Sequence, residues 1–136
     1  MKQELRKFFE EYIAFFEQTP LNELYKGDGV ERKGDAISVV GYGYHLRVYA
    51  FEKSCYNLDL MESDYLGLLK ESGGDEKTWM REIESMDLPT LKALLTYCIR
   101  GERFCDGFWI GFLEEKTFAR ILRRMRELGN EVAGKT

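Results

Sequence analysis

Apolar positions recur at helical spacing from the start of the chain. Between residues 3 and 17 they follow one another at steps of three and four, and most are aromatic. This spacing predicts an amphipathic helix over 3–17 with a wide aromatic face. Pro20 follows soon after and ends the pattern. A short helical turn is expected over 21–25.

The next stretch loses this periodicity. Residues 26–35 are polar and contain three glycines, which predicts a loop or a hairpin turn. The β-branched sequence AISVV at 36–40 favours a strand. We therefore expect a small strand or hairpin element near residues 29–41, with a partner strand at 29–33. A two-stranded ribbon needs further packing to be stable, so we expect it to lie on helices.

Residues 45–56 fit two patterns. As a strand, 45–52 would alternate from face to face, and the fold would then be α+β. As a helix, Val48, Phe51, Cys55 and Tyr56 share one stripe, and that pattern lasts longer. We interpret the segment as a helix from about residue 45. Gly41 and Gly43 before it resemble a bend, since two glycines alone do not make a phosphate-binding loop.

The second half of the chain is predicted to be helical throughout. Helices are expected over 61–71 and 75–86, with a break at 72–74. Asp87 is placed to cap a helix that has Pro89 in its first turn. Residues 88–128 should then form a three-helix unit.

The three helices of this unit are delimited by polar residues. The first ends at Arg100, with Gly101 as a left-handed cap. The second opens at Asp106, and the third covers about 117–128. The last residues, 130–136, are expected to fray.

Composition supports one compact domain. The 136 residues are 44% hydrophobic and 32% charged, which is typical of a globular chain. We predict a mainly α fold spanning 1–136. No apolar run reaches the roughly 18 residues that a bilayer span needs, and the N-terminus lacks a signal-peptide pattern. We expect a cytoplasmic protein that does not enter a membrane.

Charge is unevenly distributed along the chain. Residues 57–90 contain nine acids and three bases, whereas residues 91–136 contain six acids and nine bases. These segments are either two solvated faces or two patches that each meet a partner. The net charge of −4 argues against a dedicated nucleic-acid binder.

The candidate chemistry begins with the cysteines. Cys105 lies beside Arg103 and near a predicted helix start, both of which lower a thiol pKa. A catalytic thiolate also needs a base, and His45 is the sole histidine. A structural cysteine is the preferred interpretation. No spacing of Cys, His or acid residues indicates a metal site, and no cofactor is expected.

Charged residues cluster around Cys105. Arg100 and Arg103 could bind a phosphate or carboxylate together with free helix amides. In the preferred interpretation, both arginines instead pair with Glu102, Asp106 and nearby carbonyls, and Asp106 caps the following helix.

The last predicted helix has a basic face. It is formed by Arg120, Arg123 and Arg124. This face could contact nucleic acid, but it lacks the interleaved aromatic residues of single-strand binders. Arginines late in a helix also favour its dipole.

One motif resembles a known family. The sequence RGERFCDG runs through Arg100, Gly101, Glu102, Arg103, Phe104, Cys105, Asp106 and Gly107. Together with the aromatic helix after it and the turn into the last helix, it resembles an uncharacterised bacterial family, domain of unknown function 6508. A weaker likeness reaches back to residue 36 and supports a helix over 45–57. Lys116 and the GYGY segment depart from the family pattern, and the resemblance implies no activity.

These observations favour a non-enzymatic protein-interaction or regulatory domain. The sequence contains no complete catalytic set, and its two charged segments suit another protein or self-association as partner. An anion-binding protein or enzyme built on Arg100, Arg103 and Cys105 is one alternative. A nucleic-acid contact through the last helix is the other.

Overall fold

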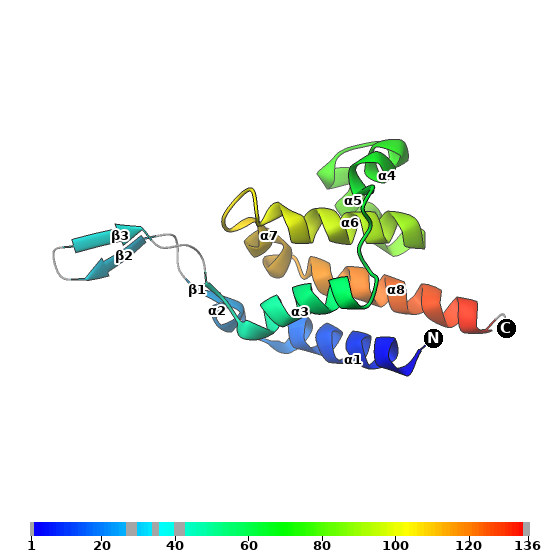
Figure 1. Cartoon of the computed structure of the whole chain (residues 1–136), viewed down its shortest axis with the longest axis horizontal. Coiled ribbons are helices and arrows are strands. Elements are labelled where there is room, and N and C mark those ends of the chain that lie inside the picture. Colours follow the sequence, from blue (N-terminus) through cyan, green and yellow to red (C-terminus); the bar gives the residue numbers. More distant parts are fainter. Residues whose placement is uncertain (1, 27–29, 34–35, 40–42, 135–136) are drawn as a thin grey trace.

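The computed structural model describes residues 2–26, 30–33, 36–39 and 43–134, with side chains for 2–26 and 43–129 (Figure 1). It confirms a mainly α fold with a small hairpin. The helices are α1 (Gln3–Gln18), α2 (Leu21–Leu24), α3 (Leu46–Asn57), α4 (Tyr65–Ser72), α5 (Glu76–Glu82), α6 (Leu88–Gly101), α7 (Phe108–Glu114) and α8 (Thr117–Gly134), with a 3-10 turn η1 (Ile83–Ser85). The strands are β1 (Tyr25–Lys26), β2 (Val30–Lys33), β3 (Ala36–Val39) and β4 (Gly43–Tyr44).

The ambiguous segment after residue 45 is helical. His45 caps α3, because its Nδ1 accepts a hydrogen bond from the Arg47 amide at 3.0 Å. Val48, Phe51 and Cys55 are buried on one stripe of the helix. The alternative strand over 45–52 is therefore wrong, since the burial follows the helical period. Gly43 belongs to β4, while Gly41 lies outside the described residues.

An aromatic core joins both ends of the chain. The Phe51 ring of α3 lies 5.8 Å from Phe8 and 4.8 Å from Phe16 of α1, measured between ring centroids. It also lies 5.3 Å from Phe118 of α8. Such pairs stabilise a fold by about 0.5–1.5 kcal/mol each beyond area burial. Figure 1 accordingly shows α1, α3 and α8 side by side, and α4 lies on the outer side of α6.

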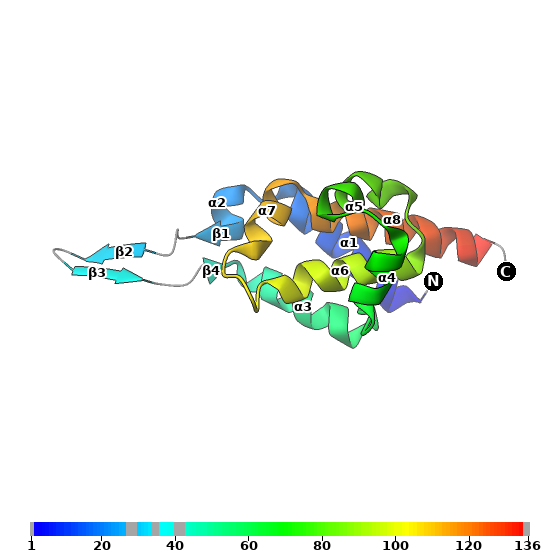
Figure 2. The same ribbon diagram turned by 90° about the horizontal axis from the view of Figure 1, so that it is seen from above.

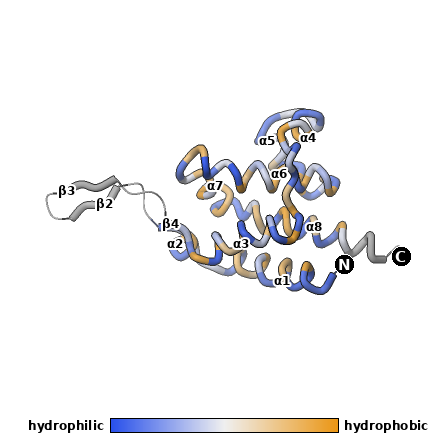
Figure 3. Tube along the Cα trace, in the orientation of Figure 1, coloured by the Kyte–Doolittle hydropathy of each residue, from blue (hydrophilic) through white to orange (hydrophobic). Residues whose placement is uncertain are grey.

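Amphipathic helices account for this arrangement. The Cα trace alternates between hydrophobic and hydrophilic stretches along α1, α6 and α8 (Figure 3). The predicted cap of α6 is confirmed, since Asp87 accepts a hydrogen bond from the Thr90 amide at 2.9 Å. The predicted break is confirmed at Gly73 and Gly74, with φ values of 81° and 79°, whereas Ser72 still belongs to α4. The helix α8 continues to Gly134, beyond the predicted end, because no proline interrupts it.

The predicted hairpin forms, but it does not pack on the helices as we expected. The strands β2 and β3 are antiparallel, with Val30 opposite Val39 and Lys33 opposite Ala36. Both views show the hairpin standing away from the helices (Figures 1 and 2). At its base the two-residue strands β1 and β4, which the sequence did not reveal, pair Tyr25 with Tyr44. The expected packing of the ribbon on helices is therefore wrong.

Candidate functional site

The RGERFCDG motif forms a corner between α6 and α7. Residues 102–107 connect the two helices, and the corner lies next to β4 and the start of α3 (Figure 2). Backbone hydrogen bonds close it tightly. The amides of Phe104 and Cys105 both donate to the carbonyl oxygen of Gly101 at 3.1 Å, and the amide of Phe108 donates to that of Cys105 at 3.1 Å.

The carboxylate of Glu102 organises this corner. It accepts hydrogen bonds from the Gly107 amide at 2.9 Å, the Trp109 amide at 2.9 Å and the Tyr44 hydroxyl at 2.8 Å. The first two bonds satisfy amides at the start of α7. Glu102 therefore caps this helix, and the predicted cap by Asp106 is wrong. The side chain of Asp106 is exposed instead.

The Tyr44 hydroxyl is held in its protonated form. Burial raises the pKa of Tyr44 strongly, and its hydrogen bond to the Glu102 carboxylate raises it further. The phenol consequently remains a donor at physiological pH. The bond ties β4 to the corner across 58 residues of sequence.

Gly101 serves a steric purpose rather than the predicted left-handed cap. It is the last residue of α6, and the cap position belongs to Glu102 in right-handed conformation. A Cβ atom at Gly101 would lie 2.0 Å from Cε2 of the Phe108 ring. Glycine is needed here because the aromatic ring lies directly on the helix backbone. The left-handed residue of the corner is Gly107, with φ at 86°.

Trp109 closes the buried side of the corner. Its indole Nε1 donates to the carbonyl oxygens of Cys98 at 3.0 Å and Ile99 at 3.1 Å. These carbonyls lie in the last turn of α6, where intrahelical partners run out. The ring also lies 5.0 Å from Tyr44. Trp109 thus holds the corner both to the end of α6 and to Tyr44 of β4.

The two arginines of the motif extend to different helices. Arg100 is half-buried, and its guanidinium lies 5.7 Å from the centroid of the Tyr65 ring in α4. Its Nε is buried and has no hydrogen-bond partner in the described part of the chain. Arg103 is exposed and donates to the Tyr56 hydroxyl of α3 at 3.4 Å. The expected ion-pair network is wrong, because Glu102 binds amides and a phenol instead.

A second carboxylate lies near Arg103. Glu52 of α3 is half-buried, and burial raises its pKa. The positive charge of Arg103 lowers that pKa in part, whereas the Glu102 carboxylate raises it. The corner therefore holds two acids near an exposed guanidinium.

The cysteines and the histidine do not form a common site. Cys55 and Cys98 are buried, and burial raises the pKa of both thiols, so both remain neutral at physiological pH. Cys105 is exposed, with its Sγ 4.0 Å from the carbonyl oxygen of Asp106. His45 caps α3, and its ring lies 5.1 Å from that of Phe15. No hydrogen bond connects Cys105 with His45 among the residues described.

Exposed aromatic side chains surround the corner. Phe104 is 79% exposed, and Tyr49 and Tyr56 of α3 are 43% and 41% exposed. The two tyrosines are seven residues apart, so they share one face of the helix. Tyr49 contacts Trp109 at 6.0 Å, and Tyr56 accepts the hydrogen bond of Arg103. We call Tyr49, Tyr56, Arg103 and Phe104 the aromatic surface. Sequence reasoning missed it; the sole available signal was the seven-residue spacing of the tyrosines.

The predicted basic face of α8 is engaged within the fold. Arg120 binds both carboxylate oxygens of Glu84, at 2.5 and 3.2 Å. Arg123 does the same with Glu17, at distances from 2.6 to 3.0 Å. Arg124 donates to the carbonyl oxygen of Met86 at 3.0 Å. These contacts tie α8 to η1, to the end of α1 and to the segment before α6.

We expect the Arg123–Glu17 pair to contribute about 0.5 kcal/mol, since exposed ion pairs are weak. The exposed fractions of the two side chains are 51% and 33%. A double-mutant cycle with Arg123→Ala and Glu17→Ala, read by urea unfolding, measures this coupling. It should shrink when the salt concentration is raised from 0.05 to about 0.5 M. A coupling that is unaffected by salt would contradict this assignment.

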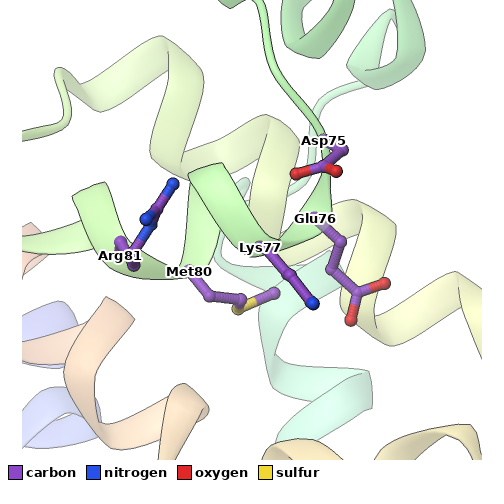
Figure 4. A pocket seen from close by; sticks show the side chains of 5 residues that line it. All are labelled: Asp75, Glu76, Lys77, Met80 and Arg81. Carbon is purple, nitrogen blue, oxygen red and sulfur yellow. The ribbon is translucent and has the colours of Figure 1, made fainter.

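Two neighbouring depressions lie beside α5. One is bordered by Asp75, Glu76, Lys77, Met80 and Arg81. Figure 4 shows these side chains fanning out, with Arg81 directed away from Glu76. The other is bordered by parts of α5, α7 and α8 and shares Glu76 and Met80 with the first. Neither brings together a set of catalytic groups.

Comparisons with known proteins identify a family without an activity. A family model described as a family of unknown function, DUF6508, matches residues 1–131. This match confirms the suspected family and extends the likeness over the N-terminal third. No curated protein and no solved structure matches the chain. Within the described ranges, no helix combines the length and the apolar character required to cross a bilayer.

Proposed function

The chain belongs to the family of unknown function DUF6508, and we propose that it is a cytoplasmic interaction domain that binds another protein through the aromatic surface. Three unpaired cysteines, one of them exposed, suit a reducing compartment. The proposal rests on one observation above all. Phe104, in the middle of the RGERFCDG motif, is 79% exposed.

The backbone presents Phe104 in a fixed position. Its amide binds the Gly101 carbonyl oxygen, and the residues on either side of it are also hydrogen-bonded. The Glu102 carboxylate anchors the other end of the loop to α7. A loop backbone held in this way loses little conformational entropy on binding. A rigid loop that exposes a large apolar ring is therefore suited to recognition.

The chemistry of the surface indicates the kind of partner. Tyrosine and arginine are enriched among the residues that dominate binding energy at protein interfaces. The side chain of Arg103 is exposed, and its guanidinium makes a long hydrogen bond of 3.4 Å to the Tyr56 hydroxyl. The partner that fits is a protein with an apolar cleft for the Phe104 ring and a carboxylate for Arg103. We favour this over a shared anion site because Arg100 and Arg103 extend to different helices.

Photocrosslinking tests this proposal. A photoreactive phenylalanine analogue at position 104 should give one discrete crosslinked species in cells of the source organism. The same analogue at Leu66, which is 63% exposed on α4, is the matched control. Adding Arg103→Glu should abolish the species crosslinked from position 104. No discrete species, or the same species from both positions, would refute the proposal.

Stability measurements separate binding from folding. Phe104→Ala should change the free energy of unfolding by less than about 0.5 kcal/mol, because the ring is mostly in solvent. Loss of the partner in this variant would then reflect the surface and not the fold.

A further inference from the structure

We propose that the β2–β3 hairpin joins two copies of this chain, with β3 of one copy pairing antiparallel with β3 of the other. The product is a four-stranded sheet in the order β2–β3–β3–β2. This proposal does not depend on the aromatic surface, which lies on the helical body.

The hairpin lacks the support that a ribbon of two strands needs. Both views show it extended away from the helices (Figures 1 and 2). Within the described residues, β2 pairs with β3 and neither pairs with another strand. An isolated two-stranded ribbon is marginally stable in water, whereas three or more strands can be stable. A second hairpin would supply the missing strands.

The two edges of the hairpin differ in charge. The strand β2 has the sequence VERK, so three of its four residues are charged. The strand β3 has the sequence AISV and carries no charge. Charged residues on edge strands prevent unwanted pairing, and uncharged edges permit it. The edge of β2 is protected in this way, and the edge of β3 is open.

Symmetry strengthens the distinction between the edges. Residues directly opposite each other in a sheet lie on the same face, so a two-fold axis must place one residue opposite its own copy. We call the residue opposite its own copy the centre of the pairing. On β2, a centre at Glu31, Arg32 or Lys33 would place like charges opposite each other, which is destabilising. On β3, a centre at Ile37 or Ser38 involves no charge. Three of the four residues of β2 would thus oppose like charges at the centre, whereas no residue of β3 would, so a second copy fits the β3 edge better than the β2 edge.

The sequence around β3 indicates which residue lies on the two-fold axis of the dimer. Residues 36–40 are all uncharged, and Ser38 is their midpoint, which leaves Asp35 outside the paired stretch. A centre at Ser38 places Ile37 opposite Val39 of the second copy, and β-branched pairs of this kind stabilise sheets. Because β3 runs from the tip of the hairpin towards its base, antiparallel pairing places the two helical bodies at opposite ends of the sheet. The bodies do not collide.

Disulfide trapping tests the register directly. In a Cys105→Ser background, Ser38→Cys places two thiols opposite each other in the dimer. Opposite Cα atoms in antiparallel strands are about 4.5–5.5 Å apart, which suits a disulfide. Glu31→Cys is the matched control, because Glu31 is opposite Ser38 within the hairpin but on the outer strand of the proposed sheet. Cys55 and Cys98 are buried and do not compete.

Mild oxidation should convert most of the Ser38→Cys protein into a covalent dimer and leave the Glu31→Cys protein monomeric. Non-reducing mass spectrometry distinguishes the two. Equal dimer yields from both variants, or no dimer from Ser38→Cys, would overturn the proposal.

Sedimentation equilibrium provides a second test without cysteines. The wild-type chain should dimerise reversibly, and Ser38→Lys should weaken the dimer by about tenfold or more because two ammonium groups meet at the centre. Glu31→Gln makes the same change of charge and should weaken the dimer less than about threefold.

Circular dichroism checks that the helices of these variants remain folded. A wild-type chain that is monomeric at about 0.5 mM would overturn the proposal, since the dimer would then be weaker than a typical specific complex. Phe104→Ala should leave dimerisation unchanged. A failure of the dimer proposal can therefore be told apart from a failure of the proposed binding through the aromatic surface.

Discussion

Replacing Glu102 with alanine is expected to lower the free energy of unfolding by about 3 kcal/mol. The substitution removes the acceptor for the Tyr44 hydroxyl and for the amides of Gly107 and Trp109. Donors left without partners at a half-buried site retain the full cost of desolvation. The loss should also loosen β4, because Tyr44 is the connection between that strand and the corner. Chemical denaturation measures the change.

Two further variants sharpen this test. Glu102→Gln keeps the shape and one acceptor oxygen but turns a donor towards the Gly107 amide, so we expect a loss of about 1 kcal/mol. Asp106→Ala removes the residue that the sequence suggested as the cap and should change stability by less than about 0.5 kcal/mol. If Asp106→Ala were as damaging as Glu102→Ala, the assignment of the cap to Glu102 would be wrong.

Gly101→Ala should destabilise the protein by about 2 kcal/mol, because the new methyl group overlaps the Phe108 ring. That ring is held by Tyr97 and Phe112, at centroid distances of 5.8 and 5.0 Å, and has little freedom to move. Thermal and urea unfolding give the change in stability.

Gly111→Ala provides the matched control. A Cβ atom at Gly111 meets nothing within 4 Å, so alanine in α7 should raise stability by about 0.5 kcal/mol. Combining Gly101→Ala with Phe108→Leu should cost less than the sum of the two single changes, because the smaller side chain relieves the overlap. Strict additivity would show that the ring is not the obstacle.

The corner illustrates how far sequence reasoning reaches. The sequence correctly predicted that one helix ends and the next begins within the motif, but it wrongly predicted a left-handed cap at Gly101. It assigned the cap to Asp106 because that residue immediately precedes the helix. The fold uses Glu102 instead, since its longer side chain extends forward from the end of α6 to the amides of Gly107 and Trp109. Local order alone does not distinguish these two acids.

The basic face of α8 shows the same limit. Helical spacing correctly places Arg120, Arg123 and Arg124 on the polar side of the last helix. Their partners come from elsewhere in the chain: Glu84 of η1, Glu17 of α1 and a carbonyl oxygen near the start of α6. A charge pattern read along one helix does not reveal partners that are 36 to 106 residues away.

The sequence by itself determined the helical class, the hairpin, the family and most of the buried stripes, because hydrophobic periodicity and turn residues are local properties. The tertiary structure alone decided which acid caps α7, which way the two arginines extend and that Phe104 lies in solvent. It also decided that the hairpin stands apart from the helices. These features depend on contacts between distant segments, and such contacts are set by packing rather than by the order of neighbouring residues.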